Sequence, residues 1–236
     1  MRGVFITFEG GDGAGKTTQL QLLAAALSER GYTVVQTREP GGTMLGTQIR
    51  ELLLHGGAVS PRAEALLYAA DRAQHVASVI RPGLEAGAVV LSDRYIDSSL
   101  AYQGGARELG AGIRAISEWA TEELWPDLTV LLDIPENEGL ARADDGHYDR
   151  IEAEGREFHR AVRENFLALA ADNPQRYLVL NARETVAELA AQIIARVETL
   201  LAGLEGLAGL ENLAGLEAVE GLADRGASGP GAGEAS

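Results

Sequence analysis

The chain has 236 residues, 46% of them hydrophobic, and no cysteine. Its length predicts one α/β domain or at most two, and the lack of cysteine excludes disulfides and cysteine-rich zinc sites. With 35 acidic against 20 basic residues, the formal net charge is −15. Such a surface repels phosphate backbones, so we expect no nucleic-acid partner. The N-terminus lacks a signal-peptide pattern, and no apolar run reaches the ~20 residues of a membrane span, which predicts a cytoplasmic protein without a membrane partner.

Apolar segments along the chain predict five strands. Three are clear, at 4–8, 89–91 and 128–132, and two are weaker, at 33–36 and 177–180. Each is followed by a turn containing glycine, proline, aspartate or asparagine, and then by residues with helical periodicity. Strands that alternate with helices form a parallel sheet covered on both faces. We therefore expect a three-layer α/β domain.

The end of the chain has a different pattern. Between residues 204 and 216 leucines recur every three residues among glycines, and residues 226–236 have the composition of a linker. A step of three residues turns an α-helix by about 300°, so these leucines spiral around it and form no single buried stripe. We expect a domain at 1–202 and a poorly ordered, low-complexity tail at 203–236. A leucine-lined interaction helix is the alternative.

A glycine-rich segment follows the first predicted strand. Residues 10–17 read G-G-D-G-A-G-K-T and fit the phosphate-binding pattern G-x-x-x-x-G-K-[ST]. The glycines let backbone N–H groups surround phosphate oxygens, and the following helix adds its positive dipole end. Lys16, the only lysine in the chain, is expected to bridge the β- and γ-phosphates, and Thr17 to ligate Mg²⁺. The alternative is a glycine-rich turn without a ligand. The predicted ATP-binding residues are Gly10, Gly11, Asp12, Gly13, Ala14, Gly15, Lys16, Thr17 and Thr18.

A P-loop predicts nucleotide binding but not what is done with the nucleotide. GTPases normally read guanine with an N-K-x-D motif, which a chain whose one lysine is Lys16 lacks, and no LSGGQ-like stretch indicates a transporter ATPase. The P-loop fits a kinase that phosphorylates one particular nucleotide, but two other functions stay open as alternatives. One is another monophosphate or deoxynucleoside kinase, and the other is a nucleotide-dependent switch that binds a protein partner through the tail.

Four further segments carry polar side chains at informative places. Because ligands of an open parallel sheet bind beyond the carboxyl ends of its strands, Asp93 and Arg94 are expected beside the P-loop. Tyr68 and Arg72 lie one turn apart on a predicted helix and share a face. The last segment has the polarity of a mobile flap at about 141–153. The segments are T-R-E-P-G-G-T at 37–43, L-L-Y-A-A-D-R at 66–72, D-R-Y-I-D-S-S-L-A-Y-Q at 93–103 and R-A-D-D-G-H-Y-D-R-I-E at 142–152.

Together these motifs resemble those of the bacterial thymidylate (dTMP) kinase family. The matching elements are F-E-G-G-D-G-A-G-K-T-T at 8–18, R-E-P-G-G-T at 38–43, A-A-D-R at 69–72, D-R-Y at 93–95, A-Y-Q-G at 101–104 and D-R-I-E at 149–152. They occur in the family's order over roughly residues 3–200. The resemblance implies a P-loop kinase fold with a five-stranded parallel sheet and a homodimer. It also implies transfer of the γ-phosphoryl group from ATP to dTMP, giving dTDP and ADP for dTTP synthesis, with Mg²⁺ as cofactor.

The resemblance implies roles for the residues that bind the acceptor. Asp12 would lie near the acceptor sugar, and three arginines would hold the acceptor phosphate and base edge with forked donors. Tyr68 would stack on thymine, where the family usually carries phenylalanine. Ser99 and Gln103 would hydrogen-bond the base, and Tyr102 would favour deoxyribose. The predicted substrate-binding residues are Asp12, Arg38, Glu39, Tyr68, Arg72, Arg94, Ser99, Tyr102 and Gln103.

Catalysis requires positive charge around two phosphates, and the P-loop itself contains no arginine. The resemblance implies that arginines of the flap supply it, with Asp149 orienting Arg150. The predicted catalytic residues are Lys16, Arg94, Arg142 and Arg150, and the predicted Mg²⁺ ligands are Thr17 and Asp93, with Asp133 as a rival to Asp93.

Several of these residues have simpler interpretations. Tyr68 is alternatively part of the helix core, and Arg72 alternatively pairs with Asp71 or Glu64 at the surface. Arg150 alternatively pairs with Glu152 or Asp149. The histidines form no metal-spaced set, and no chemistry is assigned to them: they are His55, His75, His147 and His159.

Overall fold

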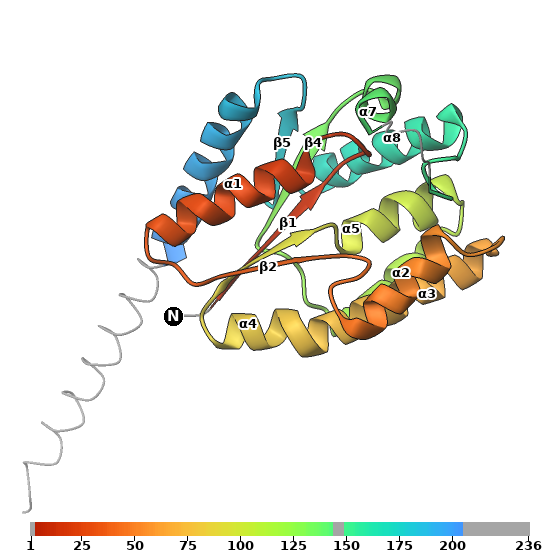
Figure 1. The fold of residues 1–236 in the computed structure, drawn as a ribbon, viewed down its shortest axis with the longest axis horizontal. Coiled ribbons are helices and arrows are strands. Elements are labelled where there is room, and N and C mark those ends of the chain that lie inside the picture. Colours follow the sequence, from red (N-terminus) through yellow and green to blue (C-terminus); the bar gives the residue numbers. More distant parts are fainter. Residues whose placement is uncertain (1–2, 144–148, 205–236) are drawn as a thin grey trace, which may run out of the picture. The chain divides into compact units, whose positions relative to one another are not determined.

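The centre of the fold is a five-stranded parallel sheet with the strand order β2-β3-β1-β4-β5 (Figure 1). The expected three-layer α/β class and the five predicted strands are confirmed. Each predicted strand continues for one or two residues beyond its predicted carboxyl end. The strands are β1 (Val4–Glu9), β2 (Val34–Arg38), β3 (Val89–Asp93), β4 (Leu128–Asp133) and β5 (Tyr177–Asn181).

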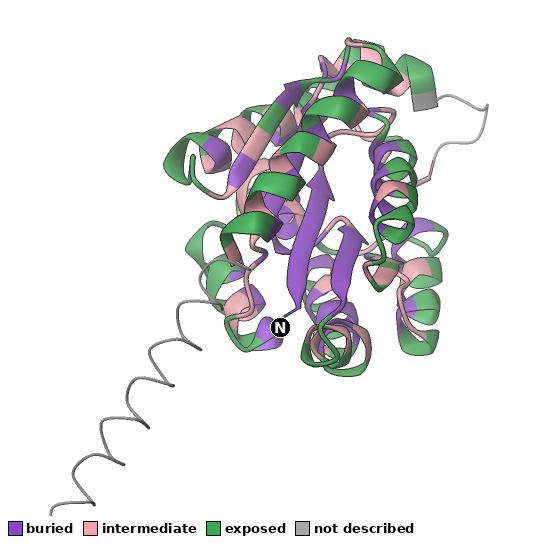
Figure 2. Ribbon diagram, turned by 90° about the vertical axis from the view of Figure 1, so that its left-hand side faces the viewer, coloured by how far each residue is buried: buried purple, intermediate pink, exposed green. Residues whose placement is uncertain are grey.

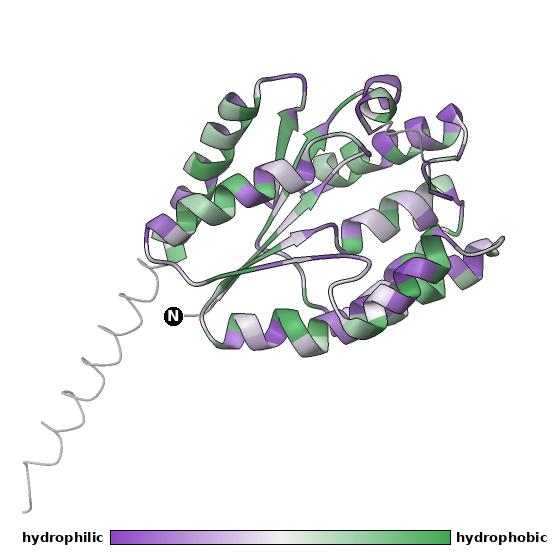
Figure 3. Ribbon diagram, viewed as in Figure 1, coloured by the Kyte–Doolittle hydropathy of each residue, from purple (hydrophilic) through white to green (hydrophobic). Residues whose placement is uncertain are grey.

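Burial explains why three strands were clear in the sequence and two were weak. β1, β3 and β4 are interior strands and are buried along almost their whole length, so both faces carry apolar residues. The edge strands β2 and β5 are partly exposed and have a mixed composition. Figure 2 shows the buried strands with helices on either side, and Figure 3 shows the hydrophobic stretches along them.

Helices fill the connections between the strands. The helix expected after the P-loop is confirmed as α1, and it packs on β1, β2 and β3. Two segments contain single π-helical turns, η1 and η2, which continue directly from α3 and α5. The bounds are α1 (Lys16–Glu29), α2 (Met44–Leu54), α3 (Pro61–His75), η1 (Val76–Ile80), α4 (Arg81–Glu85), α5 (Ile96–Ser99), η2 (Leu100–Ala106), α6 (Ala111–Thr121), α7 (Glu136–Ala143) and α8 (Arg156–Asp172), followed by helical residues at 186–204.

Two apolar clusters hold the segments that follow β3 against the rest of the domain. One packs Phe5 against Tyr95, with their ring centroids 4.8 Å apart, behind the turn that follows β3. The other places Tyr102 of η2 against Phe166 of α8, at 6.1 Å. Burying an aromatic side chain contributes roughly 1.5–3 kcal/mol, so both clusters hold η2 and the β3 turn firmly.

The computed structural model describes residues 3–143 and 149–204. The described residues fall into two units, of which one extends to Ala195 and contains the site, and the other begins at Arg196. Of the predicted flap only 141–143 and 149–153 are described, and of the predicted tail only 203–204. The expected lack of order in the tail therefore lies outside the described residues, and the boundary at 202 stays a prediction. No helix among the described residues is long and apolar enough to cross a membrane.

Candidate active site

The P-loop connects β1 to α1 in a conformation that requires glycine. Gly10, Gly13 and Gly15 have φ angles of 132°, 70° and 92°, in the left-handed region. A side chain at Gly10 would collide with the backbone carbonyl of Leu132. Gly15 is the N-cap of α1, so the loop ends at the positive end of a 14-residue helix. All nine predicted ATP-binding residues lie on this loop and the first turn of α1, and a cavity opens over it.

The side chain of Lys16 contacts the backbone of the P-loop. Its Nζ donates to the carbonyl oxygens of Gly11 at 2.8 Å and Gly10 at 3.2 Å, and the residue is buried. Burial, together with the nearby charge of Arg94, lowers the pKa of Lys16, and the carboxylate of Asp12 opposes this shift. An ammonium has three N–H donors, so one remains for a phosphate oxygen.

Thr17 and Asp93 meet at the mouth of the same cavity. Thr17 Oγ1 donates to Asp93 Oδ2 at 2.6 Å, because the parallel register of β1 and β3 brings the ends of these strands together. Asp133, the alternative carboxylate ligand, instead accepts hydrogen bonds from Arg163 Nε at 2.6 Å and Arg163 Nη2 at 2.9 Å. A hydroxyl and one carboxylate suit Mg²⁺, which takes few protein ligands and otherwise binds phosphates and water. No cluster of three acidic, histidine or cysteine ligands occurs among the described residues.

Arg94 lies at the wall between the P-loop cavity and a second cavity. Its Nη2 donates to Asp12 Oδ1 at 2.5 Å, its Nη1 donates to the Gly10 carbonyl at 3.1 Å, and its guanidinium lies 5.4 Å from the Tyr102 ring centre. Burial favours the neutral form, but Tyr102, Asp12 and Glu9 outweigh it and raise the pKa of Arg94. Burial also favours the neutral form of Asp12 and so raises its pKa, but the charges of Arg94 and Lys16 outweigh this effect and hold the pKa of Asp12 below its usual value.

Glu9, which was not among the residues predicted from the sequence, binds the backbone segment that follows Arg94. The carboxylate is fully buried and accepts from the Tyr95 backbone N–H at 2.8 Å and the Ser98 hydroxyl at 2.7 Å. Burial and repulsion from Asp97 raise the pKa of Glu9 to about 8. The sequence feature that could have identified Glu9 is a charged residue at the end of an otherwise apolar strand. Glu9 fixes the turn on which Arg94 stands.

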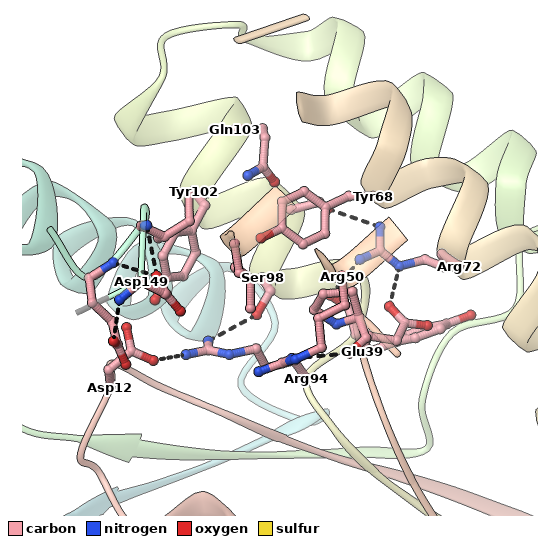
Figure 4. A pocket seen from close by; sticks show the side chains of 16 residues that line it. Asp12, Glu39, Arg50, Tyr68, Arg72, Arg94, Ser98, Tyr102, Gln103 and Asp149 are labelled. Atoms are coloured by element: carbon pink, nitrogen blue, oxygen red, sulfur yellow. Dashed lines mark hydrogen bonds and ion pairs between the residues drawn. The ribbon is translucent and has the colours of Figure 1, made fainter. Parts of the chain in front are cut away.

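The second cavity is lined by residues from α2, α3, α5 and η2 (Figure 4). Arg72 lies at one end of it, 1% exposed, and donates to Glu39 at 2.8 Å, Ser99 Oγ at 3.0 Å and the Tyr95 carbonyl at 3.1 Å. The alternative of a surface pair with Asp71 or Glu64 is therefore wrong. Arg72 is a buried part of the pocket.

Two tyrosines and a glutamine complete this cavity. Tyr68 borders it, is partly buried and also packs against an apolar core cluster, so the stacking role and the helix-core alternative both stay predictions. Burial raises the pKa of Tyr68, which keeps its hydroxyl protonated. Tyr102 also borders the cavity, and its hydroxyl has no hydrogen-bond partner among the described residues. A buried polar group without a partner is costly, and the polar group nearest to this ring is the Arg94 guanidinium. Gln103 donates from Nε2 to Glu64 at 2.9 Å.

The segment after β2 links the two cavities. Arg38 is exposed at the P-loop cavity, and Glu39, which precedes a cis peptide bond to Pro40, borders both cavities. Arg50 of α2 also borders both, and its Nη1 donates to the Pro40 carbonyl at 3.1 Å. Arg50 was missed because nothing in its helix pattern separates it from a solvated arginine.

The two flap arginines lie away from the P-loop cavity. Arg142 Nη1 donates to the Ala182 carbonyl at 2.8 Å. Arg150 donates to the Leu53 carbonyl at 2.8 Å and to Glu64 at 2.7 Å. The alternative that Arg150 pairs with Asp149 or Glu152 is wrong. The expectation that Asp149 orients Arg150 is also wrong, because Asp149 Oδ1 instead accepts the backbone N–H groups of residues 151 and 152.

The described histidines contact neighbouring segments of the fold or lie exposed at its surface. His75 is fully buried, where it binds Glu39 at 2.8 Å and Thr37 at 2.6 Å. His159 of α8 contacts the carbonyl of Glu152 at 3.3 Å. His55 is an exposed helix C-cap, and His147 lies outside the described residues.

The two cavities share residues along one wall. Asp12, Glu39, Arg50 and Arg94 border both, so a ligand on the P-loop and a ligand in the second cavity would meet at this wall. A P-loop cavity for a nucleotide, joined to a second cavity that three arginines border, defines a P-loop nucleotide kinase.

Comparison with known proteins narrows this class. The family model described as thymidylate kinase matches residues 8–193. The thymidylate kinase of Leifsonia xyli subsp. xyli is 58% identical over 200 residues, which cover 83% of this chain and 95% of that protein. That of Clavibacter michiganensis subsp. michiganensis is 55% identical over 206 residues, covering 86% and 98%. The crystal structure of thymidylate kinase from Ehrlichia chaffeensis superposes with a TM-score of 0.71 at 33% identity, covering 84% of this chain and all of that one. The chain belongs to the thymidylate kinase family.

Proposed function

We propose that this protein transfers the γ-phosphoryl group of ATP to dTMP, giving ADP and dTDP for dTTP synthesis. The observation that carries this proposal is the wall shared by the two cavities, where Arg94 and Asp12 face both. ATP would occupy the P-loop cavity and dTMP the second one, so that their phosphates meet at Arg94. The acceptor phosphate is already ionised at neutral pH, so the reaction needs no strong general base.

The protein's contribution to the reaction is positioning and positive charge. The transferring phosphoryl group passes through a loose transition state with charge spread over its oxygens. Lys16 would donate its remaining N–H to the β- and γ-phosphates, and Arg94 would neutralise the phosphates at the shared wall. Asp12 holds the Arg94 guanidinium in place at 2.5 Å and lies where the acceptor sugar would be.

Mg²⁺ is the cofactor that we propose for this reaction. Thr17 Oγ1 and Asp93 Oδ2, 2.6 Å apart, are the oxygen ligands that would hold it, directly or through water. When bound, the ion would screen the negative charge of the donor phosphates.

The second cavity fits the roles that the resemblance implies. Tyr68 would stack on the base, and Arg72, Ser99 and Gln103 would address its polar edge. The free hydroxyl of Tyr102 would face the sugar. Arg38 and Glu39 would lie at the acceptor phosphate, where their segment borders the P-loop cavity.

The proposed function is tested by ADP release with a panel of nucleoside monophosphates. We expect dTMP to accelerate ADP release strongly in the presence of MgATP, and removal of Mg²⁺ with EDTA to abolish the acceleration. A different preferred acceptor would identify another kinase of this fold. A slow rate that no monophosphate changes would indicate a nucleotide-dependent switch.

Arg142 and Arg150 are proposed as further cations for the transferring group. Each uses only part of its guanidinium in the contacts described above, and Asp149, Ile151 and Glu152 beside Arg150 border the dTMP cavity. In the proposed catalytic state, Arg150 exchanges Glu64 for phosphate oxygens.

Arg150→Ala is expected to lower kcat by at least ~10²-fold while changing the KM for dTMP far less, because the contact is made mainly in the transition state. Arg150→Lys should restore only part of the rate, since a point charge lacks the fork. Arg107→Ala is the matched control, because Arg107 also binds Glu64 at 3.2 Å but has no proposed contact with phosphate. If both alanine variants change kcat equally, Arg150 serves only as a partner of Glu64.

We further propose a cytoplasmic homodimer that binds ATP and dTMP but neither nucleic acid nor membrane. The net charge of −15 supports the absence of a nucleic-acid partner. Large apolar side chains are exposed on α2, α3 and α6, which pack side by side. Such patches support a body-to-body interface between two copies. These residues are Met44, Leu52, Leu66 and Trp119.

A further inference from the structure

Glu64 is a buried carboxylate to which the proposed mechanism assigns no contact with a substrate. It lies in the first turn of α3, is 0% exposed, and borders neither of the two cavities. Charged side chains are rarely buried without a reason, because desolvation is costly unless every lone pair finds a donor. The contacts of Glu64 show which groups stabilise its charge and which side chain it positions.

Two arginines surround Glu64. Arg107 donates to it through Nε at 3.3 Å and Nη2 at 3.2 Å, and Arg150 through Nη2 at 2.7 Å. Glu154 binds the same Nη2 of Arg107 at 2.6 Å, so two carboxylates balance two guanidiniums. Burial by itself raises the pKa of Glu64, but hydrogen bonds from Gln103 and the two arginines outweigh it and lower the pKa. Glu64 is therefore ionised at neutral pH.

The third side chain that donates to Glu64 is Gln103, which borders the second cavity, where dTMP is proposed to bind. Gln103 Nε2 lies 2.9 Å from Glu64 Oε1, and both groups are buried. An ionised carboxylate only accepts hydrogen bonds, so the amide of Gln103 must turn its NH₂ group toward Glu64. The carbonyl oxygen of the same planar amide then points away from Glu64. Figure 4 shows the amide end of Gln103 directed toward the Tyr68 ring, where the base would stack.

We propose that Glu64 is a specificity-determining positioning residue, which fixes the Gln103 amide so that its carbonyl oxygen faces the bound base. The inference rests on the proposed function and extends it. A fixed acceptor selects a base edge that carries an N–H donor, such as N3–H of thymine. It opposes a base that presents a lone pair there, such as N3 of cytosine, because two acceptors would face one another without a proton.

The experiment compares kcat/KM for dTMP and dCMP in Glu64→Gln. The neutral amide can also accept from or donate to Gln103, so the Gln103 amide is free to turn. We expect the dTMP-to-dCMP ratio to fall at least ~10-fold, through KM for dTMP with kcat changed far less. Glu154→Gln is the matched control, since Glu154 binds Arg107 but not Gln103. It should leave the ratio unchanged.

A double-mutant cycle separates positioning from a general loss of stability. Gln103→Met removes the amide at similar volume, and in that background Glu64→Gln should produce no further fall in the ratio. Glu64→Asp keeps the charge that the arginines require but withdraws the acceptor from Gln103, so it should lower the ratio even if Glu64→Gln does not fold.

Two results would overturn the inference: an unchanged ratio in the Glu64 variants, or an equal fall caused by Glu64→Gln with and without Gln103. Failure of the proposed function gives a different result, because the unmodified protein would then lack dTMP-dependent ADP release.

Discussion

Replacing Lys16 by methionine is expected to lower dTMP-dependent ADP release by several orders of magnitude, while the protein stays folded. The ammonium donates to the carbonyls of Gly10 and Gly11, which places it over the loop before any nucleotide arrives. Charge at this position stabilises the transferring phosphoryl group more than it stabilises the fold, so kcat falls and the melting temperature changes by only a few degrees. Steady-state kinetics and thermal unfolding measure the two effects.

Two further variants make this result specific. Lys16→Arg should recover little activity, because a planar fork cannot occupy the buried position of a compact ammonium between two loop carbonyls. Ser28→Met, at an exposed position of the same helix, should have no effect on kcat. Near-normal turnover in a folded Lys16→Met protein would remove Lys16 from the mechanism.

Arg94→Ala is expected to lower kcat by at least ~10²-fold, because it removes a fixed positive charge from the wall where the two phosphates meet. It also leaves Asp12 without its partner at 2.5 Å, so the KM for dTMP should rise as well. Arg94→Lys should recover part of the rate. The backbone at this position has φ 71°, which is equally strained for alanine, lysine and arginine, so the three proteins differ only in the side chain.

Arg114→Ala serves as the comparison for Arg94, since Arg114 is half exposed on α6 and pairs with Glu118 only one turn away. Loss of an exposed ion pair changes stability by ~0–1 kcal/mol, and no change in kcat is expected. If Arg94→Ala retains the kcat of the unmodified protein, the shared wall is not where the phosphates meet.

The sheet could be predicted from the sequence because local patterns determine it. Interior strands such as β1 and β4 are mostly apolar and buried, and the turn residues that follow them mark their ends. The strand-end motifs then place Asp93 beside Thr17 through the rule that ligands bind at the carboxyl ends of parallel strands, and the structure brings these two side chains to 2.6 Å.

Pairings between distant side chains could not be predicted in the same way. Arg72 and Glu39 are separated by 33 residues, and Arg150 and Glu64 by 86. Nothing in the local pattern of either segment favours one acidic partner over another. The sequence pointed to near neighbours such as Asp71 and Asp149. The packing of α3 against the turn after β2, and of the segment around Arg150 against α2, decides which carboxylate is within reach.

The burial of Arg72 also has a consequence for the thermodynamics of ligand binding. A guanidinium has five N–H donors, and here three are already bound to Glu39, Ser99 and the Tyr95 carbonyl, so two remain. Immobilising a free side chain of this kind on binding costs ~0.5–1.5 kcal/mol of conformational entropy. Arg72 has no such freedom left to lose when a ligand enters the pocket. The cost of ordering this side chain is therefore part of folding and not of binding.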